Sequence, residues 1–408
     1  MLSHQKRDDL LSLPENSPII IVGAGIAGLT LSLALARHGQ RSIVLEARDQ
    51  PITDGAGIQL GPNATVLLDR LGVLNAVKRS ATQPEAVVVR ALATGKFICE
   101  LPLVDKRHNG ASAPYLVVHR ADLHKALKNA AEAESEIQFR FGWQLIDVEQ
   151  QGRQVVARCE NERQIEGQAV VGCDGLWSRA RQVIAPDFEL KYAGLIAARA
   201  VVPMANAPSD LRDSNTGVWL GPEAHIVKYP IDCGGSIALV VVTSNPQRLV
   251  GWGHDLEPYE LLRRVPPRAP DLSALLQSAT SWRQWALYDP EPLASWSKGQ
   301  TIVIGDAAHP ILPFLAQGGA MAIEDAFCLA DCMTESNPQE AFAAFELLRR
   351  DRVARVQIES RKNGQIYHLS GIPAVARDTA MRLLPRSQLM RRYDWIYSWR
   401  PQSMASGS

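Results

Sequence analysis

The sequence predicts an α/β (α+β) fold in which a Rossmann-like domain is interleaved with an antiparallel-sheet domain and followed by a layer of helices. Residues 18–46 run as strand, glycine-rich turn, apolar helix and second strand, which is the order of a βαβ unit. Residues 191–244 alternate strand-like runs with glycine turns, a pattern typical of antiparallel pairing. Residues 338–401 are rich in arginine and read as helices.

The composition narrows the class of partner. With 408 residues, 46% of them hydrophobic, the chain can bury a large core in two or three domains. Lys and Arg together number 43, as do Asp and Glu, so no net charge favours nucleic acid or an anionic membrane. We therefore expect small molecules as partners.

The six cysteines show neither a C-x-x-C pair nor zinc spacing, so we expect reduced thiols, a cytoplasmic protein and no metal site. Cys328 and Cys332 are interpreted as one face of a helix. The residues through Ser17 are polar and read as a loose arm, neither signal peptide nor membrane span. Residues 403–408 are expected to be disordered.

The glycines at 23, 25 and 28 predict a site for a dinucleotide. Gly23 permits the tight turn, Gly25 lets the backbone approach a pyrophosphate, and Gly28 lets the helix pack on the strand. The helix N-terminus adds free N–H groups and positive dipole, and Glu46 follows where a ribose hydroxyl needs an acceptor. The pattern alone does not separate FAD from NAD, and a purely structural glycine turn is the alternative.

The next segments are expected to support this unit. Residues 47–72 read as an irregular loop before a helix capped near Asn63, and residues 84–106 as a hairpin that pairs with a distant sheet. A helix is predicted from Arg120 with Leu123 and Leu127 inward, followed by one strand over 139–149.

A second strand end carries Asp174 and Gly175, which form either a simple turn or a contact to a cofactor. The following helix start carries Arg179 and Arg181, which we interpret as surface charges, with contacts to the nicotinamide phosphates as the alternative. Residues 255–296 are interpreted as a polar helical connector that carries tryptophans at 282, 285 and 296.

His225 and Tyr229 lie four residues apart in a predicted strand and therefore project from the same face. The strand rise separates them by about 13 Å along the backbone, so a small aromatic ring fits between the two side chains. The alternative is a structural histidine whose hydrogen bonds are satisfied on the face of the sheet.

Residues 301–326 read as a buried strand ending at Gly305 and Asp306, a proline-containing loop, and a helix opened by Gly318 and Gly319. Asp306 can accept a hydrogen bond from a ribitol or ribose hydroxyl. The helix N-terminus can direct N–H groups at the electron-rich pyrimidine end of a reduced flavin. His309 is interpreted as structural.

Four of these stretches resemble the single-component FAD-dependent aromatic hydroxylases of the para-hydroxybenzoate hydroxylase fold, in particular the salicylate hydroxylase and 3-hydroxybenzoate 6-hydroxylase branch. They are GAGIAG (residues 23–28), GAGIQLGPN (residues 55–63), GPEAHIVKY (residues 221–229) and GDAAHP followed by PFLAQGG (residues 305–319). The resemblance covers about residues 18–400. Two residues depart from the family pattern. Ala198 stands where a large aromatic usually precedes the arginine, which is expected to affect pocket size. Gly319 stands where alanine is usual, which is expected to loosen the start of the helix.

The resemblance implies a set of cofactor contacts, with Arg120 against FAD, Leu145 near the adenine and Pro313 beside the flavin. The expected cofactor-binding residues are Gly23, Gly25, Ile26, Ala27, Gly28, Glu46, Arg48, Gln59, Arg120, Leu145, Asp174, Asp306, Pro313, Gly318, Gly319 and Ala320. The resemblance also implies an FAD-binding domain at 18–83, 107–187 and 297–345, a substrate domain at 84–106 and 188–296, and C-terminal helices at 346–401.

The implied activity is hydroxylation of a phenolic or hydroxylated heteroaromatic substrate with NAD(P)H and O2, through a flavin C4a-hydroperoxide. Because only one G-x-G-x-x-G is present, NAD(P)H is expected to bind transiently, and the protein to be a monomer or homodimer. His225 would take the phenol proton, Tyr229 would hydrogen-bond the oxyanion, and Gln317 would orient ring or peroxide. A flavin enzyme acting on non-phenolic substrates and a non-catalytic flavin redox sensor are the alternatives.

Overall fold

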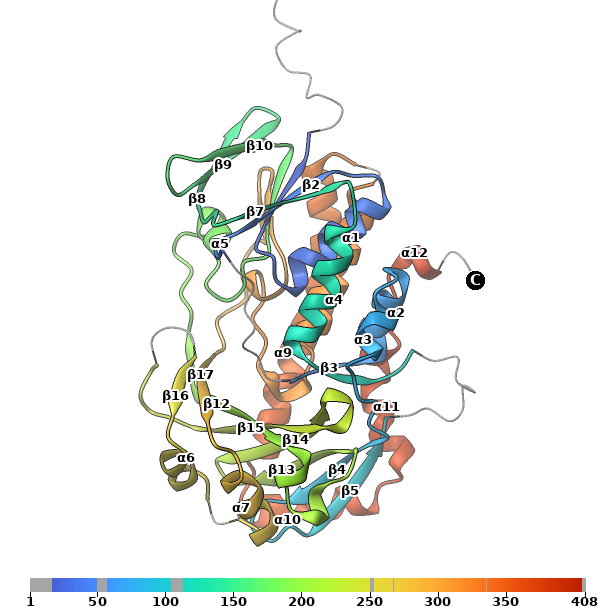
Figure 1. Cartoon of the computed structure of the whole chain (residues 1–408), viewed down its shortest axis with the longest axis vertical. Coiled ribbons are helices and arrows are strands. Elements are labelled where there is room, and N and C mark those ends of the chain that lie inside the picture. The colour runs from blue at the N-terminus through green and yellow to red at the C-terminus, as the bar shows by residue number, and fades with distance from the viewer. Residues whose placement is uncertain are drawn as a thin grey trace, which may run out of the picture.

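Two sheets, one above the other in Figure 1, form the framework of the protein. The computed structural model describes residues 17–49, 57–103, 113–249, 253–266, 268–334 and 336–405. The upper sheet is parallel except at its β18 edge, and its strands in order are β18 (Ser297–Lys298), β19 (Thr301–Val303), β11 (Ala169–Gly172), β1 (Ile19–Val22), β2 (Ser42–Glu46) and β7 (Ile137–Phe141).

The upper sheet is covered on both sides, which explains why β1 reads as four consecutive apolar residues, all buried. On one side lie α1 (Ile26–Arg37) and α4 (Arg120–Glu132), and α8 (Gly318–Cys332) packs against α1. The opposite side carries a three-stranded sheet of β8 (Leu145–Gln151), β9 (Gln154–Cys159) and β10 (Gln164–Gly167). The predicted βαβ unit is therefore present, with the predicted strand and helix order.

The lower sheet has eight strands and is antiparallel except where β13 runs parallel to β4. In order these are β16 (His254–Leu256), β17 (Trp282–Tyr288), β12 (Tyr192–Pro203), β15 (Ser236–Ser244), β14 (Ala224–Ile231), β13 (Thr216–Gly221), β4 (Ala86–Ala91) and β5 (Phe97–Pro102). One face packs on α6 (Pro258–Arg264) and α7 (Pro270–Gln277). The other faces the upper sheet, so the predicted antiparallel sheet and its distant hairpin are both found.

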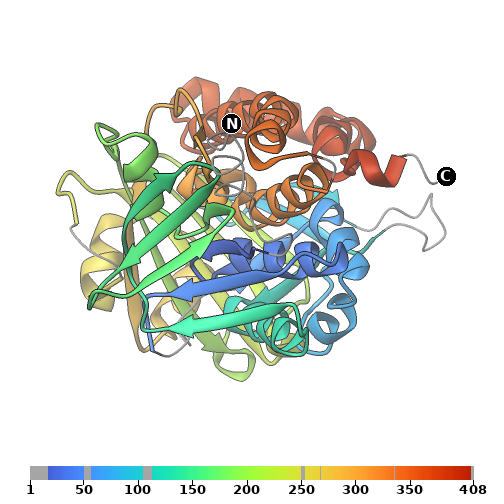
Figure 2. The ribbon, with the colours of Figure 1, turned by 90° about the horizontal axis from the view of Figure 1, so that it is seen from above.

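Helices of the C-terminal region hold the two sheets together. The 30-residue helix α9 (Pro338–Tyr367) runs from the level of the upper sheet to the lower one (Figure 1). Beyond it, α10 (Gly371–Leu383) and α11 (Arg386–Tyr397) pack on β5, and α12 (Gln402–Ala405) follows. Seen from above, these helices gather on one side of the molecule (Figure 2). Among the described residues, none of the helices has the length and apolar character needed to cross a membrane.

The structure corrects several sequence expectations in the upper half of the molecule. Residues 57–60 form strand β3 (Gly57–Leu60), paired with β6 (Leu116–His119), instead of an irregular loop. The next helix, α2 (Pro62–Arg70), starts at its proline and is capped by Gly61, so Asn63 lies inside it and is buried. Residues 139–149 are two strands of different sheets, separated by a turn at Gly142, whose φ is +68°.

Other corrections concern the connector and the C-terminus. The segment 255–296 contains β17, which pairs with β12 and places Trp282 in the core of the lower sheet. The expected boundary at residue 346 falls inside α9. The helices α10 and α11 pack on β5 of the lower sheet, and α11 also contacts α2. Residues 403–405 are helical, whereas residues 1–16 and 406–408 lie outside the described residues.

Candidate active site

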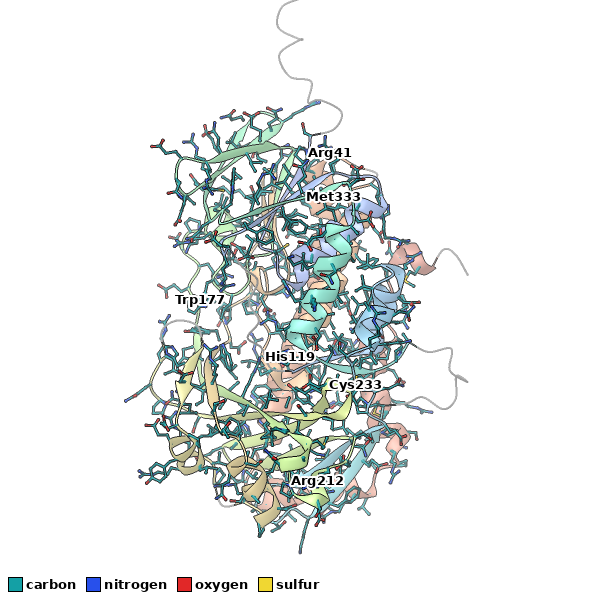
Figure 3. The ribbon with its side chains drawn as sticks, in the orientation of Figure 1. Arg41, His119, Trp177, Arg212, Cys233 and Met333 are labelled. Carbon is teal, nitrogen blue, oxygen red and sulfur yellow. The ribbon has the colours of Figure 1, made fainter. Side chains whose placement is uncertain are left out.

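A continuous cleft separates the two sheets. It consists of an upper cavity of about 720 Å³ and a lower cavity of about 560 Å³. The two cavities share eight lining residues: Gly25, Ile26, Arg48, Arg120, Cys173, Gly175, Leu176 and Trp177. Trp177 lies between the upper and lower halves of the molecule (Figure 3). The upper cavity lies at the carboxyl ends of β1, β2 and β11, where open α/β sheets bind their ligands.

The glycine-rich turn at the end of β1 has the geometry of a phosphate cradle. Gly23 has a φ of +101°, and a Cβ there would stand 2.7 Å from the carbonyl oxygen of Cys173. A Cβ at Gly28 would overlap the Gly23 carbonyl oxygen, so this glycine permits helix and strand to pack. At Gly25, by contrast, a Cβ would meet nothing within 4 Å, because this position faces the cavity. The backbone is therefore open to a ligand at the expected point.

Glu46 closes the far end of this cavity. Its carboxylate accepts hydrogen bonds from the backbone N–H groups of Ala24, at 3.0 Å, and Arg48, at 3.1 Å. These contacts fix the side chain and leave lone pairs for a ribose hydroxyl, since an ionised carboxylate accepts about four hydrogen bonds. Leu145 also lines this cavity, and its contact to the adenine stays a prediction.

Asp174 is occupied within the protein. Its carboxylate accepts hydrogen bonds from the Ser178 hydroxyl and from two backbone N–H groups at the start of α5 (Arg179–Ile184). The residue lines the upper cavity, and burial raises the pKa of its carboxyl group. The structure thus supports a role in shaping the turn, and the contact to a cofactor stays a prediction.

Arg181 is not the surface charge that we expected. It is 4% exposed and donates hydrogen bonds to the carbonyl oxygens of Ala307, at 2.9 Å, and Leu176, at 2.5 Å. It therefore ties the loop after β11 to the loop after β19. Arg179, in contrast, is exposed at the rim of the cleft, as expected.

Asp306 and Arg120, which line the cleft, have no hydrogen-bond or ion-pair partner among the described residues. Asp306 is accessible from the cleft and accepts no hydrogen bond from them, and the removal of bulk water raises the pKa of its carboxyl group. Arg120, at the start of α4, likewise makes no hydrogen bond or ion pair within the described chain. A bound polar ligand would satisfy both groups.

The N-terminus of α8 faces the same cleft through Gly318 and Gly319. A Cβ at Gly319 would stand 2.5 Å from the Cδ1 atom of Ile58, so glycine lets β3 approach the helix start. The helix runs unbroken from Gly318, and the loosening that we expected from this glycine is not seen. Together with the open Gly25 and the unpaired Asp306, this helix start fits FAD.

The lower cavity contains His225 and Tyr229, which share a face of β14 as predicted. The Nδ1 atom of His225 lies 2.9 Å from Nε2 of His368, and its ring contacts those of Phe314 and Tyr367. Burial, with a smaller contribution from His368, lowers the pKa of His225 to about 3. The imidazole is therefore neutral at physiological pH and can accept a proton.

Tyr229 donates its hydroxyl proton to the carbonyl oxygen of Gly57, at 2.8 Å. Burial raises the pKa of Tyr229 to about 12, although Arg199 opposes this shift. In this arrangement the hydroxyl presents a lone pair to the cavity. This differs from the expected donation to a substrate oxyanion, for which the bond to Gly57 would have to be given up.

Gln317 does not lie where the sequence predicts. It is 2% exposed, is absent from the cleft lining, and accepts a hydrogen bond from Nδ2 of Asn63 at 3.0 Å. The preceding residue, Ala316, has a left-handed φ of +53°, and the chain enters α8 with the Gln317 side chain inside the protein. Ala320 is likewise buried and absent from the cleft lining, whereas Pro313 and Gln59 line the cleft as expected.

Asn63 connects Gln317 to a buried charge network. It donates to Glu324, whose carboxylate also accepts from Arg349 and Arg352 of α9. His309 bonds Asp325 of the same helix at 2.6 Å, which agrees with its interpretation as structural. No group of histidine, cysteine, aspartate and glutamate that could hold a metal ion occurs in the described segments of the chain.

The predicted site residues do not include Arg199 and Trp285, which line the lower cleft, or His368, which contacts His225. The guanidinium of Arg199 lies 5.2 Å from the Trp285 ring centre and makes no hydrogen bond or ion pair with any described residue. Its Nε atom is buried without a partner, and burial lowers the pKa of the side chain. An arginine within a strand-like apolar run is the signal that could have identified it.

Ala198, which we expected to affect pocket size, faces the opposite side of β12 and packs in the core below the lower sheet. Adjacent residues of a strand point to opposite faces, so the residue before Arg199 cannot share its cavity. Ala197, two residues before Arg199 on the same face, is fully buried and packs with Val242 and Leu312.

The chain matches the family described as FAD binding domain over residues 16–356. It is 35% identical over 388 residues to 3-hydroxybenzoate 6-hydroxylase 1 of Aquipseudomonas alcaligenes, covering 93% of this chain and 97% of that protein. It is 32% identical to 6-hydroxynicotinate 3-monooxygenase of Pseudomonas fluorescens, covering 86% and 92%.

Solved structures show the same fold. A salicylate hydroxylase substrate complex superposes with a TM-score of 0.79 at 22% identity, covering 94% of this chain and 96% of that one. Klebsiella pneumoniae HpxO with FAD and uric acid gives 0.80 at 22% identity, covering 93% and 96%.

Proposed function

The chain belongs to the FAD-dependent aromatic hydroxylases, and from this premise we propose that its substrate is a small ring carrying both an ionisable hydroxyl and an acidic group. The observation that carries the proposal is the pair of chemically opposite groups in the lower cleft. His225 is neutral and can accept a proton, and Arg199 is a cation without a protein partner. A hydroxybenzoate or hydroxynicotinate would meet both.

Arg199 is the reason to expect an acidic group on the substrate. A buried guanidinium that lacks a partner is unfavourable, and a carboxylate forms two parallel hydrogen bonds with it. The second cleft arginine near it, Arg283, also contacts the Trp285 ring, at 5.9 Å. The positive charge of this wall would therefore orient an anionic ring with its acidic group toward β12 and β17.

The ring itself would lie against apolar residues that exclude water. Val227, Val240 and Val242 from β14 and β15 line the cavity, and Leu312 faces them from the loop before α8. In such a site the hydroxyl proton has no solvent to accept it, which leaves the Nε2 atom of His225, the ring nitrogen without a protein hydrogen bond. Removal of that proton makes the ring electron-rich.

When bound, FAD would supply the activated oxygen after reduction by NAD(P)H. The overall reaction consumes the phenol, O2, NAD(P)H and a proton, and yields the dihydroxylated ring, water and NAD(P)+. The glycine-rich turn, Glu46 and Asp306 would hold the cofactor, and the start of α8 would present its N–H groups to it. His225 and Arg199 hold and activate the ring.

A substrate panel tests this proposal. NAD(P)H oxidation and product would be measured with 3-hydroxybenzoate and 6-hydroxynicotinate, and with 3-hydroxybenzamide as a neutral isostere of the first. We expect stimulation by the carboxylates and a much higher KM for the amide. Arg199→Met should remove this preference, raising KM for the carboxylate by about 10- to 100-fold, equivalent to about 1.5–3 kcal/mol for a hydrogen bond to a charged group. Equal KM values for acid and amide in the wild-type enzyme would contradict the proposal.

A further inference from the structure

His225 cannot act alone, because the cavity gives it no way to dispose of a proton. Burial lowers the pKa of its imidazole to about 3, and the imidazolium is therefore strongly disfavoured. His225 is 3% exposed and its other neighbours are the rings of Phe314 and Tyr367. Burial also raises the pKa of the Tyr367 phenol, which keeps it protonated. A proton taken from a substrate must leave through another group.

His368 is placed to receive it. It caps the C-terminal end of α9, and its Nε2 atom lies 2.9 Å from Nδ1 of His225, with the ring centres 5.1 Å apart. His368 is partly exposed, unlike His225, and so can exchange protons with bulk water. The charged group that faces it is Arg377 of α10, which together with burial lowers the pKa of His368 and disfavours storage of charge there.

We propose that His225 and His368 form a proton relay that carries the hydroxyl proton of the substrate to solvent, a role for His368 that rests on the proposed function of the cleft. The two neutral rings share one proton in their hydrogen bond. When His225 donates from Nδ1, its Nε2 lone pair faces the ligand, and His368 carries its remaining proton on Nδ1.

Transfer then needs no lasting charge on either ring. The substrate O–H bond breaks as His225 Nε2–H forms, and His225 Nδ1–H breaks as His368 Nε2–H forms. His368 Nδ1–H then breaks as water takes the proton. The product of these steps has His225 Nε2–H donating to the phenolate oxygen, which stabilises it. His368 thus acts through His225 and does not touch the substrate.

Proton release without turnover tests the relay. The oxidised FAD-bound enzyme, in weak buffer with a pH indicator and no NAD(P)H, would be mixed with 3-hydroxybenzoate or 6-hydroxynicotinate, whichever stimulates NAD(P)H oxidation. Flavin absorbance reports ligand binding, and the indicator reports the proton. In the wild-type enzyme we expect proton release to follow binding closely.

The informative variants are His368→Gln and His368→Ala. Glutamine keeps an N–H donor for His225 but cannot pass a proton on, so both variants should bind ligand normally and release the proton about 10²-fold more slowly. Added imidazole should accelerate release in His368→Ala alone. His38→Gln, which changes an exposed histidine remote from the cleft, is the matched control and should behave as wild type.

The outcomes separate the two proposals. Proton release as fast in His368→Gln as in wild type means that His368 only positions His225, and overturns the relay. Ligand binding to the wild-type enzyme without proton release also overturns it. If neither carboxylate stimulates NAD(P)H oxidation, the proposed function fails and the relay falls with it. If His368→Ala loses FAD, the glutamine variant decides.

Discussion

In the proposed function, individual side chains of the lower cleft have separate roles in binding and in activating the substrate. Arg199 is a cation without a protein partner, and His225 is a base without a charge. The two face the same cavity from adjacent regions of one sheet, so a single small ring can meet both. Replacement of a single side chain in the lower cleft should therefore alter the chemistry and leave the cofactor site intact.

Replacement of His225 by asparagine should separate cofactor reduction from ring activation. The variant should still bind FAD and consume NAD(P)H and O2 when substrate is present, because His225 lies on β14 of the lower sheet and the glycine-rich turn follows β1 of the upper sheet. Product formed per NAD(P)H should fall by about 10²-fold or more, with hydrogen peroxide released instead. Product and peroxide would be quantified at several pH values.

Raising the pH toward the pKa of the substrate hydroxyl should restore some of the coupling in His225→Asn. Tyr229→Phe serves as the comparison and should lose less, since it removes one hydrogen bond to Gly57 and leaves the base in place. Full coupling of His225→Asn at neutral pH would show that the histidine only supports the sheet.

The lowered pKa of His225 also predicts how stability depends on pH. Between pH 6.5 and about 3 the unfolded chain binds a proton that the folded protein excludes, so the free energy of unfolding falls as the pH is lowered through this window. His368, whose pKa is also lowered, acts in the same direction. Urea unfolding of wild type and His225→Asn at pH 7, 5 and 4 should show a shallower loss for the variant. Parallel curves would mean that His225 titrates in the folded protein as it does in the unfolded chain.

At the scale of elements, the contact between α8 and α9 holds the N-terminus of α8, which faces the cleft, in place. Glu324 and Asp325 of α8 and Arg349 of α9 are all fully buried, and Arg349 donates to both carboxylates at 2.8 Å. Glu324 in turn holds Asn63, which holds Gln317 directly before the start of α8. A buried network thus connects α9 to the rim of the cleft.

Arg349→Met should destabilise the protein by about 3–5 kcal/mol, because it leaves buried carboxylates short of a partner. Lys362→Met in the same helix is the matched control. Its ion pair with Glu359 is exposed, so we expect a change of less than about 1 kcal/mol. Denaturant unfolding and FAD retention would be measured for both. Equal stabilities of the two variants would rule out the network as a support of α8.

The elements that the sequence predicted well are those whose residues are fixed by backbone geometry. Gly23 and Gly28 are required by close approaches to Cys173 and Gly23, and such requirements are visible in the pattern itself. The shared face of His225 and Tyr229 follows from the period of a strand. The same rule, applied to Arg199, would have excluded Ala198 from the cavity.

The residues that the sequence could not place depend on distant contacts. His368 meets His225 across 143 positions, at the end of a helix whose direction only tertiary packing decides. The inward direction of Gln317 follows from the left-handed turn at Ala316 and from a partner, Asn63, in another helix. The split of residues 139–149 into two strands depends on the turn at Gly142.

For the whole molecule, binding of the cofactor and stability of the fold should be linked, because the residues that we propose to bind FAD line a cleft between the two sheets. The lining of the cleft comes from both, with Gly25 and Asp306 from the upper half and Arg199 and His225 from the lower. A ligand that binds only the folded state stabilises it increasingly as its concentration rises above its dissociation constant. FAD should therefore raise the melting temperature.

The purified protein should be yellow because it holds FAD noncovalently. Denaturation should release this FAD. Glu46→Ala should weaken FAD binding by about 1–3 kcal/mol, since it removes an acceptor for the cofactor and for the N–H groups of Ala24 and Arg48. Flavin fluorescence after denaturation and titration of the apoprotein would measure both effects. Release of NAD without flavin absorbance would contradict the assignment.

The length of α9 fixes the spacing between the two halves of the site. Arg349 is fixed against α8, and His368 lies 19 residues further on, a span of about 28 Å at 1.5 Å per residue. Insertion of one residue between them would turn His368 by about 100° around the helix axis and carry it away from His225. The stretch between Arg349 and His368 should therefore tolerate substitutions far better than changes of length. An inserted residue would have to be balanced by a deletion within the same stretch.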